Sequence, residues 1–168
     1  MDALKQYFLP YIISNLLFLL CLIVAVKRTI WARIFLAIVF LWASYTNFTT
    51  AISNPEIYLE YGGLTPLPLY REFINGFFAL HIKFLVSTVA VGEFFVFVGL
   101  ILNNGWVKSA CIGGIIFGLA ISPLGVGSAF PSTVLMAMAF WVLFRKGPHS
   151  YIWNLRQYTS LAHHALID

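Results

Sequence analysis

The feature that most constrains this chain is one carboxyl group inside a long apolar segment. Glu93 lies in the segment Ala79–Leu102, which is otherwise almost wholly apolar and is long enough to cross a bilayer. A carboxyl group at that depth is costly unless it is protonated, paired or hydrated. Glu93 is therefore the first candidate for a functional residue.

The composition predicts a membrane protein. Of the 168 residues, 61% are hydrophobic and only 10% are charged, whereas a soluble domain carries roughly a quarter charged residues. The net charge of +4 does not indicate nucleic acid, because the basic residues fall between the apolar segments. We expect an all-α, polytopic helix bundle of one domain, residues 1–168, with the lipid bilayer as its partner and no nucleic acid.

Five apolar segments are expected to be spans. A hydrocarbon core of ~30 Å needs ~20 helical residues, so the last two segments are short. The segments cover approximately residues 7–26, 32–53, 77–102, 106–122 and 132–144.

The charges predict the orientation of these spans. Basic residues gather in alternate connections and after the last segment, which the positive-inside rule assigns to the cytoplasm. The N-terminus is therefore expected outside and the C-terminus in the cytoplasm. The basic residues concerned are Lys27, Arg28, Arg33, Lys108, Arg145, Lys146 and Arg156.

Two segments outside the spans also carry patterns. The outer connection, residues 54–76, is rich in Tyr, Pro and Gly, and Pro68 is placed to begin a short interfacial helix. We expect a cap over the outer mouth of the bundle, with a mobile loop as the alternative. The tail, residues 149–166, has the spacing of an amphipathic helix, which would lie on the cytoplasmic membrane face or dock a partner subunit.

Polar side chains in the outer halves of the second and third spans predict an outward-facing pocket. Hydrogen-bond donors beside aromatic walls suit a small polar head such as a quinone ring. The alternative is helix–helix hydrogen bonding without a ligand. The candidate ligand-binding residues are Trp42, Tyr45, Asn47, His81, Lys83 and Ser87.

Small residues recur every four positions in the fourth span and predict close helix packing. We call them the small-residue stripe: Ala110, Gly114, Gly118 and Ser122. Because Glu93 and Gly118 fall at similar depth, a protonated Glu93 could donate to a carbonyl beside Gly118. Glu93 would then be structural; otherwise it handles protons or binds a ligand. No residue pattern predicts a metal site, and no motif identifies a catalytic reaction.

Several of these motifs resemble the DoxX-like family of small bacterial membrane proteins. The resemblance covers residues 34–144. It is carried by Phe40-Leu41-Trp42-Ala43, by Asn47-Phe48, by the Gly62-to-Pro66 loop and above all by the run from Gly92-Glu93 to Gly99-Leu100.

The resemblance implies a four-helix core, with 7–26 as an extra N-terminal helix, in a bacterial-type inner membrane. The named member of the family is the small subunit of a thiosulfate:quinone oxidoreductase, so it also implies a quinone near the family's buried carboxylate, here Glu93. Asn47 departs from the lysine that often stands at that position. We therefore expect a redox-associated membrane subunit, with quinone as its candidate ligand. The alternative is a non-catalytic accessory subunit packed against a larger membrane complex.

Overall fold

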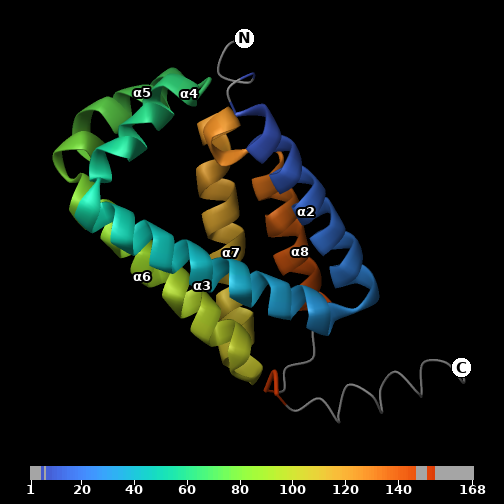
Figure 1. Ribbon diagram of the computed structural model, residues 1–168. Helices are drawn as coiled ribbons and strands as arrows, with labels where there is room; N and C mark the ends of the chain where they lie inside the picture. The colour runs from blue at the N-terminus through green and yellow to red at the C-terminus, as the bar shows by residue number, and fades with distance from the viewer. Residues whose placement is uncertain (1–4, 6, 147–150, 154–168) are drawn as a thin grey trace, which may run out of the picture.

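The computed structural model describes residues 5, 7–146 and 151–153, and this part of the chain is helical with no β-strand (Figure 1). The prediction of an all-α membrane helix bundle is confirmed. The predicted tail helix at 149–166 lies almost wholly outside the described residues.

Five long helices form the bundle. Four segments are long and apolar enough to cross a membrane: α2, α3, α6, and α7 together with the turn η3 that follows it. The described part of α8 has 15 residues and is shorter than that. The bounds are α2 (Phe8–Lys27), α3 (Thr29–Ser53), α6 (Ile82–Ile101), α7 (Asn104–Ile121), η3 (Ser122–Ser128) and α8 (Ser132–Lys146).

The third predicted span begins later than expected. We predicted its start at residue 77, but α6 begins at Ile82. The regular helix is interrupted at His81, whose backbone has φ −124° and ψ 21°, and a π-turn, η2 (Ile74–Phe78), precedes it. Part of the predicted third span therefore belongs to the cap.

The helices pack in a closed ring in which α2 contacts α3, α3 contacts α6, α6 contacts α7, α7 contacts α8, and α8 contacts α2. In Figure 1, α2 and α3 meet at their short connection and diverge from there, while α6 runs beside α3. Consecutive long helices run in opposite directions, so the α2–α3 and α6–α7 connections and the end of α8 lie at one end of the bundle. The cap and η3 lie at the other.

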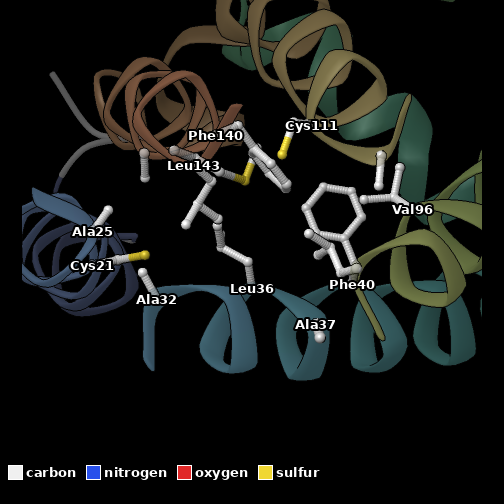
Figure 2. Packing of buried hydrophobic residues seen from close by; sticks show 14 of the residues in the cluster. Cys21, Ala25, Ala32, Leu36, Ala37, Phe40, Val96, Cys111, Phe140 and Leu143 are labelled. Atoms are coloured by element: carbon white, nitrogen blue, oxygen red, sulfur yellow. The ribbon is translucent and has the colours of Figure 1, made fainter. Parts of the chain in front are cut away.

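The apolar core fills the middle of the ring. Phe40 of α3 meets Phe140 of α8 edge to face at 5.3 Å between ring centroids (Figure 2). Phe40 also meets Phe117 of α7 at 5.7 Å. Both cysteines, Cys21 and Cys111, are buried thiols in this core, as expected of small core residues. Large apolar side chains cover the outside, as lipid contact requires.

Small residues of α7 allow close approach to its neighbours. A Cβ added at Gly114 would lie 2.4 Å from the Phe140 ring, and one added at Gly118 would lie 2.8 Å from the Thr133 carbonyl oxygen, both on α8. Ser122 hydrogen-bonds the Thr133 hydroxyl at 2.9 Å. Three members of the predicted small-residue stripe thus face α8.

The fourth member of the stripe meets α6. A Cβ added at Gly99 of α6 would lie 2.7 Å from the Cβ of Ala110. The stripe is therefore used within the chain, where it brings α7 against both of its neighbours.

Arg33 is a basic residue whose place the charge pattern did not predict. Its side chain is 1% exposed, and it donates to the carbonyl oxygens of Leu100 and Leu102 at the end of α6. Carbonyls at a helix C-terminus lack intrahelical partners, and a cation there is favourable. Arg33 therefore caps α6 in addition to marking the basic end of the bundle.

The outer connection folds as a series of short helices. They are η1 (Pro55–Glu60), α4 (Tyr61–Leu64), α5 (Pro68–Phe73) and η2. Pro68 is at the start of α5, as predicted, because its fixed φ and missing N–H suit a first helical turn.

The cap is tied to η3 and to the end of α7. The Thr65 hydroxyl donates to the Pro123 carbonyl at 2.7 Å, and the Tyr70 hydroxyl donates to the Ala120 carbonyl at 3.0 Å. Gly125 has φ +65°, and a Cβ there would lie 2.8 Å from Pro66. These contacts join the cap to η3 and to the outer end of α7.

We predict that Gly118→Ala destabilises the bundle, by about 1–3 kcal/mol, because the added Cβ would collide with a backbone carbonyl that cannot move alone. Thermal unfolding in detergent measures the change. The control is Gly92→Ala on α6, where an added Cβ meets nothing within 4 Å. Equal stability of the two variants would contradict the close α7–α8 contact.

Candidate functional site

The buried carboxyl group of Glu93 is paired with an amide. Glu93 projects from the middle of α6 and is 2% exposed. Asn47 Nδ2, on the outer half of α3, lies 2.9 Å from Glu93 Oε1 and 2.7 Å from Oε2. The partner of this carboxyl group is therefore neutral, and both groups belong to the most extensive helix pair in the bundle.

Tyr58 of the cap adds a third group. Its hydroxyl donates to Asn47 Oδ1 at 2.7 Å, and this fixes the amide orientation, because Nδ2 must then face Glu93. Burial raises the pKa of Tyr58, a hydrogen bond with Thr50 lowers it, and a negative charge on Glu93 raises it. With its pKa raised overall, the phenol keeps its proton at neutral pH and can serve as a donor. A chain of phenol, amide and carboxyl thus joins the cap, α3 and α6.

A cavity of about 610 Å³ lies against this chain of groups. This volume is in the range of small-molecule sites, which are ~300–1,000 Å³. All five long helices, the cap and η3 contribute to its wall. Its polar side includes Asn47, Tyr58 and Glu93, and its aromatic side includes Tyr11, Phe18, Trp42, Tyr61 and Phe117.

The cavity is acidic and aromatic. Among the described residues that line it there are two carboxyl groups, Glu60 and Glu93, and no Lys, Arg or His. The hydroxyl of Tyr7 donates to Glu60 Oε2 at 3.1 Å, which connects the start of α2 to the cap at the outer rim. An anionic headgroup would meet unfavourable charge here, whereas a neutral or cationic head would not.

The structure separates the predicted ligand-binding residues into two groups. Asn47 and Trp42 line the cavity, but the other four candidates do not. His81 is exposed and its Nδ1 contacts the Phe77 carbonyl at 3.0 Å. The three remaining residues lie on outward or half-buried faces of α3 and α6, away from the cavity: Tyr45, Lys83 and Ser87.

The suggested bond between Glu93 and a carbonyl beside Gly118 is wrong. Similar depth along two helices did not bring them together, because Gly118 faces α8 and Glu93 faces α3. The carboxyl group found a side-chain partner in Asn47.

Sequence reasoning missed Tyr58 as a member of the site. It was read only as one of several interfacial tyrosines of the outer connection. The sequence does contain a signal that points to Tyr58. Pro55 follows Asn54 directly after α3 and begins η1, so the chain turns back at once. Such a turn returns the next aromatic residue toward the outer end of α3, where Asn47 lies.

Comparisons with known proteins give no match: no protein-family model, no curated protein and no solved structure is similar to this chain at a significant level. The function has to be argued from the site itself.

We predict energetic coupling between Asn47 and Glu93. Asn47→Leu and Glu93→Leu each leave a buried polar group without its partner, whereas the double variant removes both groups. A double-mutant cycle of unfolding free energies should give a coupling of about 0.6–1.7 kcal/mol, the range of such bonds in membranes. Strict additivity of the two single changes would argue against the bond.

Proposed function

We propose that the protein is a redox-associated membrane subunit that binds the head of a quinone in the cavity beside Glu93. The observation that carries this proposal is the phenol–amide–carboxyl chain in the wall of a cavity within the bundle. A quinone ring is flat, neutral and apolar on its faces, and it has two carbonyl oxygens that accept hydrogen bonds. Aromatic walls with a few donors match these properties.

The residues at the wall have separable roles in this proposal. Asn47 Nδ2 and the Tyr58 hydroxyl are the donors in this part of the wall, and a quinone oxygen would replace one of their present acceptors. Glu93 can hold a proton next to that oxygen, inside the membrane and away from bulk water. Electrons would come from, or pass to, a partner subunit. The resemblance to the DoxX-like family, whose named member acts with quinone, adds support to this choice of ligand.

The acidic residues that line the cavity limit the charge that a ligand head can carry. A phospholipid head would bring a phosphate next to Glu60 and Glu93, with no basic side chain among the lining residues to neutralise it. A hydrophobic amine is the strongest competing ligand, because carboxyl groups and aromatic rings both attract cations.

The competing proposal of a purely accessory subunit is based on two features, the small-residue stripe and the tail. The contacts of the stripe weaken the first of these reasons. Gly114, Gly118 and Ser122 pack against α8 of the same chain, and Ala110 packs against Gly99, so the stripe is not a free docking face. The tail lies outside the described residues.

The test is retention of quinone on the purified protein. Wild-type protein in mild detergent should yield close to one quinone per chain on organic extraction. Asn47→Leu and Glu93→Leu should each weaken the quinone affinity about tenfold and thereby lower the retained amount, since each loss of a well-placed polar contact costs ~1.4 kcal/mol or more. Thr88→Val on the exposed face of α6 is the control, because within the described part of the chain its hydroxyl bonds only the Phe84 carbonyl.

Two results would contradict the proposal. One is extraction of no quinone from wild-type protein that rebinds none when it is supplied. The other is tighter binding of a hydrophobic amine that quinone cannot displace.

We further propose a bacterial-type inner membrane, with the N-terminus and the cap outside and the end of α8 in the cytoplasm. The basic residues Lys27, Arg28, Arg145 and Lys146 lie at the end of the bundle opposite the cap.

Cysteine labelling tests this orientation. Both native cysteines are buried, so their background reaction with a membrane-impermeant maleimide should be low. In intact cells Glu56→Cys, in the cap, should react, and Arg145→Cys should react only after permeabilisation. The reverse pattern would contradict the proposed orientation.

A further inference from the structure

We infer that the lipid-facing groove between α2 and α3 binds the isoprenoid tail of the quinone and is the lateral entrance to the cavity. This inference rests on the proposed function and names a second part of the same binding site.

The groove adjoins the cavity. It has a volume of about 510 Å³ and is lined by residues of α2 and α3. Five residues from the two helices line both the groove and the cavity, so the two spaces are direct neighbours. The shared residues are Pro10, Ser14, Phe18, Val39 and Trp42.

The shape of the bundle explains the groove. Between their connection and the contact of Phe18 with Phe35, which meet edge to face at 6.1 Å, the helices α2 and α3 are packed together. The two helices diverge from their connection toward the cap (Figure 1), and the groove lies where they are further apart than at this ring contact. From Leu9 to Phe18 the groove runs for ~13 Å along α2, with Phe18 and Phe35 at its inner end.

The chemistry of the groove suits a hydrocarbon chain. Apart from Ser14 and the indole of Trp42, every lining side chain is apolar. Among the described residues, the side chains that line the groove form no hydrogen bond across it. Ile13 and Leu17 are each about half exposed and Leu9 about two thirds exposed, on the side that faces lipid.

A second groove, of about 580 Å³ between the cap and α7, is the competing entrance. It touches the cavity through Tyr58, Tyr61 and Ile121. Hydrogen bonds fasten this side: Tyr58 donates to Asn47, and Tyr70 donates to the Ala120 carbonyl. Opening it would break these bonds. On the α2–α3 side the contacts between the two helices at the groove are apolar, and the hydrogen bonds of Tyr7 and Asn15 tie α2 to the cap and to Ala129 instead of to α3.

Photolabelling in liposomes tests the inference. The probe is a quinone with a diazirine on the second isoprene unit of its tail, and labelled peptides are identified by mass spectrometry. We expect the label on α2 and α3, at or beside Leu17 and Phe35. A photoreactive phosphatidylcholine at the same concentration should label these positions less, and unlabelled quinone should compete only with the quinone probe.

Leu17→Trp fills the groove without touching the cavity, because Leu17 lines only the groove. It should reduce quinone labelling at least fivefold and leave binding of a tail-less quinone unchanged. Leu16→Trp is the matched control on the neighbouring lipid-facing position, where the side chain is 61% exposed, and it should change neither.

The outcomes distinguish this inference from the proposed function. Label on α5 or α7, equal labelling by the phospholipid, or equal effects of the two tryptophan variants would overturn the inference while tail-less quinone still binds. If tail-less quinone fails to bind wild-type protein, the proposed function fails and the inference fails with it.

Discussion

The structure depends on how one carboxyl group is accommodated inside a membrane bundle. Glu93 is fully enclosed, and its oxygens receive the amide of Asn47 instead of a positive charge. In hydrocarbon, a polar group without a partner costs several kcal/mol, so the partner fixes the rotation of α6 against α3. A neutral partner also leaves the carboxyl group able to accept another donor or to hold a proton. A carboxylate in an ion pair with a basic side chain would not have this freedom.

A series of polar links from α3 to α6 supports this pair. Arg33 donates to carbonyls at the inner end of α6, the Ser44 hydroxyl donates to the Ala90 carbonyl at 2.8 Å, and Asn47 reaches Glu93. All three donors are on α3, and the first two act on backbone that is otherwise shielded from water. The helix pair that positions the site is therefore held by directional bonds.

The other side of the cavity is held differently. Where α2 faces α3, apolar packing holds the two helices, with Phe18 against Phe35 as the outermost close ring contact. At its outer end, Tyr7 bonds Glu60 and Asn15 Nδ2 bonds the Ala129 carbonyl at 3.0 Å. Apolar contacts between a helix and its neighbour are replaced by lipid contacts at little cost. A bundle built this way has one wall fixed by directional bonds, where we propose that a polar head binds, and a softer wall next to the bilayer.

Much of the fold follows from the sequence, because apolar length and the positions of basic residues determine where helices begin and end in a membrane. The short helix at Pro68 and the close packing at Gly118 also follow from local rules for proline and for small residues. The site was only half predictable. Asn47 and Glu93 were each singled out as polar residues in lipid, but their pairing depends on the rotation of two helices about their axes, which hydropathy does not encode.

The same limit explains the errors in the site. His81 and Lys83 were grouped with Asn47 because they share a depth, yet depth does not say which face of a helix a side chain occupies. Tyr58 was missed because its role depends on the path of a connecting segment after Pro55. Arg33 matched the charge rule for topology but also caps α6, a contact that only the three-dimensional arrangement reveals.

Infrared difference spectroscopy of a bound quinone tests the central claim most directly, because it reports hydrogen bonding at each quinone oxygen. With carbon-13 at one carbonyl at a time, we expect one carbonyl band to move to lower wavenumber on binding and to return toward its lipid value in Asn47→Leu. Carbonyl bands that are the same in the protein as in lipid alone, or that do not respond to Asn47→Leu, would contradict the account.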